Sequence, residues 1–138
     1  MADLLIQEQS NERKYWTQIP NIVYELGLSP YALALYNIIK RTAGQNGACW
    51  RSARTLAKDC NMSPSTVSKA KQELAQPFDL LDGKPLIVIQ EMRAHPGTNK
   101  NKPGGRPYHH ITIVDIWDQN MAYFSRSPDD LWKIARRS

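Results

Sequence analysis

The sequence has no long hydrophobic run. Its 138 residues contain no apolar stretch that approaches the ~18–20 residues of a transmembrane helix. The first residues, Met1 to Glu8, also lack the basic segment and the long apolar stretch of a secretory signal peptide. We therefore expect a cytoplasmic protein without a membrane partner.

Cysteine is scarce as well. Cys49 and Cys60 are too few for a disulfide framework and for a zinc site made of cysteines alone. Free thiols are typical of proteins from a reducing compartment, which agrees with a cytoplasmic location. We expect both side chains to pack as small apolar groups.

Several motifs for catalysis are missing. No Gly-x-x-x-x-Gly-Lys-Ser/Thr loop that would cradle a phosphate occurs, and no Asp-x-Asp pair stands near a tyrosine. His109 and His110 are adjacent, so on a strand their side chains point to opposite faces and cannot share one metal ion. We expect no enzymatic activity, no metal and no cofactor.

The composition is that of an ordinary folded domain. Hydrophobic residues make up 41% of the chain and charged residues 22%, close to average globular usage. At ~100–200 residues per domain, the length predicts a single domain. We expect the tryptophans Trp16, Trp50 and Trp117 to lie in its core or at the rim, because the chain shows no interleaving of aromatic and basic residues.

The positive charge is concentrated in the middle of the chain. Eighteen Lys and Arg residues against thirteen Asp and Glu residues give a net charge of +5. Residues 30–110 carry a balance of +7, whereas residues 1–29 carry −2 and residues 111–138 are neutral. A basic region between acidic and neutral segments favours binding to a polyanion, most often a nucleic acid.

Three helices are predicted from their starts and stops. Serine followed by proline begins a helix at Ser29-Pro30, where serine caps free N–H groups and proline suits the first turn, and Ala43-Gly44 ends it. A second, short helix starts at Ser52 and ends at Asn61, a residue that tolerates a left-handed turn. A third helix starts at Ser63-Pro64 and runs to about Gln76, before Pro77.

The inward and outward faces of the third helix follow from the helical period. We expect Val67, Ala70 and Leu74 to face the core. The outer face then receives polar side chains, with Lys71 at its edge: Ser65, Thr66, Ser68, Lys69, Gln72 and Glu73.

Two β-rich segments, 86–93 and 108–114, predict an antiparallel hairpin. Its long tip at 94–107 has three glycines, three prolines and three basic residues but no acid. A short strand is expected at Ala48-Cys49-Trp50, and a last helix is expected to begin at Ser127-Pro128.

A short helix, a turn, a second helix and then a hairpin form a helix-turn-helix with a wing. The predicted fold is therefore α+β: a winged helix-turn-helix with a three-helix core, a β-hairpin wing and a C-terminal helical extension. We expect an N-terminal tail at 1–14, the winged-helix domain at 15–118 and the extension at 119–138. Aromatic and aliphatic residues beyond the domain suggest that the extension folds back on it or packs on a second copy.

The partner expected for this arrangement is double-stranded DNA. A recognition helix that enters the major groove would contact it through Ser63, Ser65, Thr66, Ser68, Lys69 and Gln72. The wing and the flanks of the second helix would hold the phosphate backbone through Arg51, Arg54, Lys58, Arg93, Lys100, Lys102 and Arg106.

The helix starts also carry a family pattern. It comprises an Ile-Pro-Asn lead-in followed by Leu-Ser, a Ser…Leu-Ala helix and a Ser-x-x-Thr-Val start of the recognition helix. The residues that carry it in this sequence are Ile19-Pro20-Asn21, Leu28-Ser29, Ala32, Tyr36, Ser52, Leu56-Ala57, Asn61-Met62-Ser63 and Thr66-Val67. Over roughly residues 15–118 this pattern resembles the winged-helix domain of phage and plasmid replication initiators and primosome-loading proteins (replication protein O-like or primosomal DnaD-like). Asn61 stands where that family usually has glycine, and the tip at 94–107 is longer than a minimal wing.

The resemblance implies recognition of a replication origin by a bacterial, phage or plasmid protein associated with the nucleoid. Partners would then include replication proteins and a second copy, joined through the N- and C-terminal segments. A transcriptional repressor of the same fold would use the same groove chemistry. A winged helix that acts only as an interaction or oligomerisation module is a further alternative; it would have an apolar recognition face and salt-insensitive DNA binding.

Overall fold

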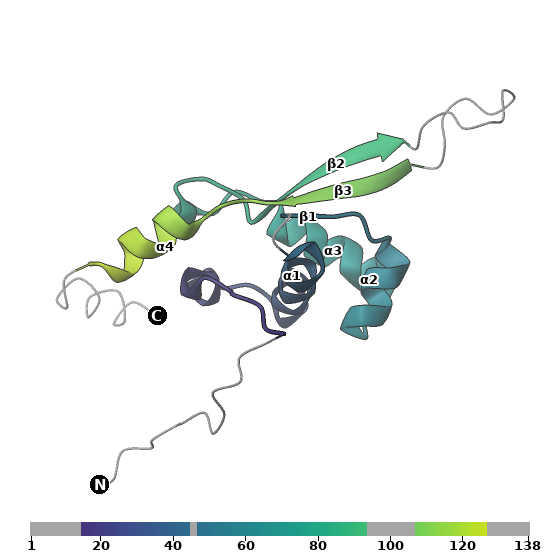
Figure 1. The fold of residues 1–138 in the computed structure, drawn as a ribbon, viewed down its shortest axis with the longest axis horizontal. Helices are drawn as coiled ribbons and strands as arrows, with labels where there is room; N and C mark the ends of the chain where they lie inside the picture. Colours follow the sequence, from purple (N-terminus) through teal and green to yellow (C-terminus); the bar gives the residue numbers. More distant parts are fainter. Residues whose placement is uncertain (1–14, 45–46, 94–106, 127–138) are drawn as a thin grey trace, which may run out of the picture.

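The computed structural model describes residues 15–44, 47–93 and 107–126 (Figure 1). Its helices are α1 (Pro30–Ala43), α2 (Ala53–Cys60), α3 (Pro64–Leu74) and α4 (Trp117–Phe124), and its strands are β1 (Ala48–Cys49), β2 (Ile87–Arg93) and β3 (Pro107–Ile113). Two 3-10 segments, η1 (Asn21–Glu25) and η3 (Asp79–Leu81), complete the order. The predicted tail at 1–14, most of the predicted tip, and the helix expected from Ser127 lie outside the described residues.

Serine side chains cap all three helices of the core, as predicted. The hydroxyl of Ser29 accepts a hydrogen bond from the backbone N–H of Ala32 at 3.1 Å. Ser52 accepts from Thr55 at 3.1 Å and Ser63 accepts from Thr66 at 3.2 Å. Each bond satisfies one of the N–H groups that have no partner inside the first turn, so the start of each helix is fixed by its own residues.

The turn between α2 and α3 is three residues long. Asn61 adopts the left-handed conformation, with φ 55° and ψ 48°, and its N–H bonds back to the carbonyls of Ala57 and Lys58. Asparagine tolerates this conformation better than most side chains do. The tight turn places α3 directly after α2, as in a helix-turn-helix.

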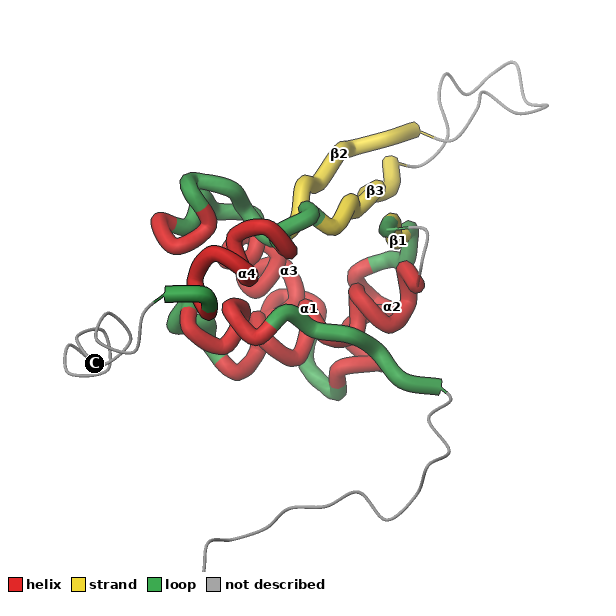
Figure 2. The backbone as a smooth tube through the Cα atoms, turned by 60° about the vertical axis from the view of Figure 1, so that its left-hand side comes forward, coloured by secondary structure: helices red, strands yellow, loops and turns green. Residues whose placement is uncertain are grey.

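The three helices and the sheet share one core. Its largest fully buried side chains include Tyr36 and Ile39 of α1, Leu56 of α2 and Leu74 of α3. Leu86, Ile87 and Ile111 contribute the buried side of the sheet. Figure 2 shows β2 and β3 to one side of the helices, and β1 pairs with β3 near the base of the hairpin.

The strands form an antiparallel sheet in the order β1-β3-β2. Cys49 of β1 pairs with Ile111 of β3, and Ile87 to Arg93 of β2 pair with Ile113 to Pro107 of β3. The hairpin extends beyond α3 and ends above α2 in the view of Figure 1. The predicted α+β winged helix-turn-helix is confirmed by this arrangement of helices and strands.

Helix α4 overlaps the predicted C-terminal extension, although no helix start was predicted at this point. Ile116 gives no side-chain cap, and the carboxylate of Asp115 accepts a hydrogen bond from the N–H of Trp117 at 3.0 Å. It packs on η1, where the side-chain oxygen of Asn120 accepts from the backbone N–H of Ile22 at 2.9 Å and Tyr123 is buried. The chain after the hairpin therefore folds back on the domain. No helix in the described part of the chain is long and apolar enough to cross a membrane.

Two expectations for the third helix are wrong. The helix ends at Leu74 and not near Gln76, because Ala75 is its C-cap and the residue before a proline avoids helical geometry. Glu73, expected on the exposed face, is half-buried, and its two carboxylate oxygens accept from the N–H of Ser29 at 2.7 Å and from the Ser29 hydroxyl at 2.8 Å. This pair joins the end of α3 to the start of α1.

Candidate nucleic-acid interface

The outward face of α3 is polar and open. Ser65, Ser68, Lys69 and Gln72 are exposed, while Val67, Ala70 and Leu74 on the opposite face are buried. Thr66 is half-buried beside the capping residue Ser63, which is exposed. The predicted recognition residues therefore lie together on one side and at the N-terminal end of one helix.

The hydroxyl groups at the start of α3 bond to one another. The Ser63 hydroxyl lies 3.1 Å from that of Ser65 and 2.8 Å from that of Thr66. The Ser68 hydroxyl donates to the carbonyl of Pro64 at 3.2 Å. These groups are committed to the first turn, so they suit phosphate contacts near the cap better than base reading.

Lys69 and Gln72 are the base-reading candidates. Neither side chain makes a hydrogen bond to the described part of the protein, and both are exposed. The amide of glutamine can bond to N6 and N7 of adenine at once, and the amine of lysine can reach the acceptors of guanine. Because they are three residues apart, they lie on the same side of α3.

The position of Lys71 differs from the prediction for the outer face of α3. Although expected at the edge of the outer surface, it is buried, and its amine lies 3.3 Å from Nδ1 of His109 on β3. Burial lowers the pKa of Lys71, and the nearby Cys49 opposes this shift. The contact connects α3 to a strand of the wing, so Lys71 is a positioning residue and not a DNA contact.

The buried amine of Lys71 should make the stability pH-dependent on the alkaline side. Its pKa is lowered from 10.5, so between the lowered value and 10.5 the unfolded chain binds more protons than the folded one. The free energy of unfolding should therefore rise with pH in this window. Urea unfolding from about pH 7 to about pH 10 should show the wild type gaining stability relative to Lys71→Met. Tyr36 and Lys40 are present in both proteins, so their contributions to the pH dependence cancel in the comparison. If the stability of the wild type and of Lys71→Met changed with pH in parallel, the amine of Lys71 would not be desolvated.

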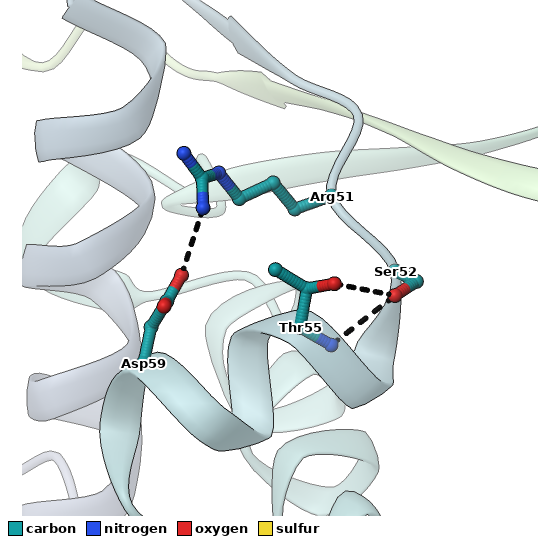
Figure 3. A network of polar contacts seen from close by, with 4 residues as sticks. All are labelled: Arg51, Ser52, Thr55 and Asp59. Carbon is teal, nitrogen blue, oxygen red and sulfur yellow. Dashed lines mark hydrogen bonds and ion pairs between the residues drawn. The ribbon is translucent and has the colours of Figure 1, made fainter.

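The basic residues at and around α2 lie in two separate places. Arg54 and Lys58 line a shallow hollow of about 510 Å³ together with Asn61 and Ser63 at the start of α3. Two cations beside a helix N-terminus form a suitable place for a phosphate group. Arg51 lies apart from this hollow, since its guanidinium donates to the carboxylate of Asp59 at 3.1 Å (Figure 3).

The Arg51–Asp59 pair is solvent-exposed. Such surface pairs contribute about 0–1 kcal/mol, so a phosphate can replace the carboxylate at small cost. Figure 3 also shows the neighbouring Ser52–Thr55 cap, which fixes the residue that follows Arg51. The arginine is therefore held at the start of α2 but free to change partner.

The wing is only partly described. Arg93 is exposed at the outer end of β2, where it pairs with Pro107 across the hairpin. Lys100, Lys102 and Arg106 lie outside the described residues. Their role in phosphate binding remains a prediction from the sequence.

The histidines and the free thiols agree with the sequence. His109 contacts Lys71, whereas the ring of His110 lies 5.0 Å from that of Trp50, so the two histidines use opposite faces of β3. Within residues 15–44, 47–93 and 107–126, no group of three or more His, Cys, Asp or Glu side chains could hold a metal ion. Cys49 is buried and Cys60 half-buried, both with free thiols.

Trp50 is a surface residue that the sequence did not assign to the interface. Its side chain is 55% exposed, although it directly follows β1, and it packs on His110 at an interplanar angle of 54°. It stands between the sheet and the Arg51–Ser52 start of α2. Only the pairing of β1 with β3 reveals this position, because Trp50 and His110 are far apart in the chain.

A comparison with protein families agrees with this geometry. The family model described as a helix-turn-helix domain matches residues 26–76, which include α1, α2, the turn and α3. Comparison with curated proteins and with solved structures finds no significant match. The matched helices, followed by the hairpin and the three-stranded sheet, form a winged helix-turn-helix.

Proposed function

We propose that this chain binds double-stranded DNA and recognises a replication origin, as the DNA-binding domain of a phage- or plasmid-type initiator. The helix-turn-helix match supports DNA binding. The initiator role is supported by the Ile19-Pro20-Asn21 lead-in and the helix-start pattern that resemble that family. The proposal assigns no catalytic step to the chain and places it with the nucleoid in the cytoplasm.

The observation that carries the proposal is the polar, unobstructed face of α3. Eleven residues at 1.5 Å each give a helix of ~16 Å, enough to present two to three turns to a groove of ~12 Å width. The Glu73 contact with Ser29 and the Lys71 contact with His109 attach this helix to the start of α1 and to β3. Base-reading side chains are thus presented from a rigid support, which direct readout requires.

The same face disfavours a module that only binds proteins. Such a module would need an apolar centre in its contact surface, whereas the exposed residues of α3 after Pro64 are serine, lysine and glutamine. Arg54 and Lys58 beside the α3 N-terminus add positive charge where a phosphate backbone would pass.

Salt dependence should separate these two functions. If the recognition helix, the α2 flank and the wing neutralise about five to eight phosphates, log affinity should fall with log salt at a slope of about −4 to −7. Fluorescence anisotropy of a labelled duplex between about 50 and 200 mM salt would measure it. A slope near zero would favour the interaction module.

Selection of bound duplexes from a random pool would test the origin role against the repressor role. We expect a short asymmetric site that occurs in several copies in one stretch of the replicon. A single palindromic site, with half-sites about one helical turn apart, would instead indicate a dimeric repressor. Replication proteins, such as a helicase loader, would then bind next to the repeated sites.

A further inference from the structure

A second pocket lies away from α3 and the hairpin. It has a volume of about 490 Å³ and is formed by the segment before η1, the C-terminal end of α1 and the start of α4. The residues that matter here are Trp16, Thr17, Gln18, Lys40, Arg41 and Trp117. None of the predicted DNA-contact residues in the described part of the chain lines it.

Two tryptophans in this pocket are exposed. The side chain of Trp16 is 61% exposed and that of Trp117 is 40% exposed, and neither belongs to the buried core. An indole ring is a large flat apolar surface, which favours a planar ring as its partner. Stacking between a nucleic-acid base and an aromatic ring is such a pairing, and it tolerates every base.

Two cations stand beside these rings. The amine of Lys40 lies 5.7 Å from the centre of the Trp117 ring, and partial burial lowers the pKa of Lys40 against the opposing effect of Asp115. Arg41 is exposed at the same helix end. The polar side chains of Thr17 and Gln18 complete the wall, so the pocket offers hydrogen bonds as well as flat surfaces.

Arg41 connects this pocket to the flank of α2. It also lines a second hollow, of about 300 Å³, with Arg51 and Asp59 between α1 and α2. A single strand of nucleic acid whose phosphates contact Arg51 and then Arg41 would reach Trp16 and Trp117. The only acid that lines either pocket is Asp59, as far as the described residues go, and it is paired with Arg51.

We propose that this pocket binds an unpaired base of a single-stranded nucleic acid, with the base stacked on Trp16 and its phosphate on Arg41. The proposal goes beyond duplex recognition by α3 and does not depend on it. It also corrects the expectation from the sequence, because the fold gathers aromatic and basic residues that do not alternate along the chain. An origin-binding protein with both surfaces could hold a paired site and an opened strand together.

The test measures binding of the full chain to a labelled oligothymidylate of about twelve nucleotides, within the usual range of single-strand sites. Trp16→Ala should lower this affinity about 5- to 100-fold, as expected for the loss of one stacking contact. Arg41→Ala should weaken binding and reduce the salt slope by about 0.7, the value for one phosphate on a single strand. The matched control is Tyr31→Ala, which removes an aromatic ring of α1 that is 57% exposed and lies outside the pocket.

A selected duplex is measured with the same variants. Trp16→Ala should change duplex affinity by no more than about twofold. Lys69→Ala should reduce duplex affinity but not oligothymidylate affinity. A wrong assignment of base recognition to α3 is thus distinguishable from a wrong assignment of the pocket. An oligouridylate of equal length shows whether DNA or RNA is the preferred source, and a preference for either supports the site. Equal oligothymidylate affinity of Trp16→Ala and Tyr31→Ala would overturn the proposal. It would also be overturned if Trp16→Ala changed the oligomeric state without losing affinity for the oligonucleotide, because the pocket would then bind a second copy of the chain.

Discussion

Replacing Lys69 and Gln72 by alanine should lower the affinity for the preferred duplex by about 30-fold or more while leaving non-specific binding nearly unchanged. A good contact to a base edge contributes about 1–3 kcal/mol of discrimination, and these two exposed residues lie three positions apart on one side of α3. Competition titrations with the selected site and with unrelated DNA would measure both affinities. The matched control is Lys84→Ala with Gln76→Ala, which removes the same residue types from exposed positions outside α3.

The wing should behave differently from the helix. Changing Lys100, Lys102 and Arg106 to alanine should weaken binding to all sequences about equally and reduce the salt slope by about 3, because each cation releases about one counterion. If the α3 variant and the wing variant lost affinity in the same pattern, the division into a base-reading helix and a phosphate-holding wing would be wrong.

Removing the Glu73 carboxylate should destabilise the domain. Glu73→Ala leaves the N–H of Ser29 without its partner and breaks two short hydrogen bonds to a charged acceptor. We expect the free energy of unfolding to fall by about 2–3 kcal/mol. For a chain of this size the melting temperature should fall by roughly 6–15 °C.

Two variants sharpen this measurement. Glu91→Ala removes a carboxylate from an exposed position on β2 and should change stability by no more than about 0.5 kcal/mol. Glu73→Gln keeps one oxygen acceptor and should lie between the wild type and Glu73→Ala. If Glu73→Ala and Glu91→Ala lowered the free energy of unfolding by the same small amount, the contact between α3 and α1 would not stabilise the domain.

Positions of secondary structure were predictable where the signal is local. Ser29, Ser52 and Ser63 each bond to an N–H three residues ahead, so a capping serine announces a helix without any knowledge of the rest of the chain. Asn61 forms the left-handed turn through its own backbone preference. The helical period likewise predicted the exposure of Ser65, Ser68, Lys69 and Gln72 on α3, but not the partial burial of Thr66 and Glu73.

Contacts between distant segments were not predictable. Lys71 is exposed or buried according to where β3 passes, and Glu73 is exposed or buried according to where α1 begins. Helix α4 packs against η1 through Asn120, whose side chain accepts from the N–H of Ile22, 98 residues away in the chain. The pocket of Trp16, Arg41 and Trp117 joins three segments that show no common pattern along the chain.

By itself, then, the order of residues determined the three core helices, the turn, the hairpin and most of the polar side of α3, since hydrogen bonds within a few residues and the helical period define them. Tertiary structure alone decided which polar groups stay free for a ligand and which hold the elements together. Burial and long-range hydrogen bonds depend on which surfaces meet, and Lys69 and Lys71, two residues apart on one helix, have opposite environments for that reason.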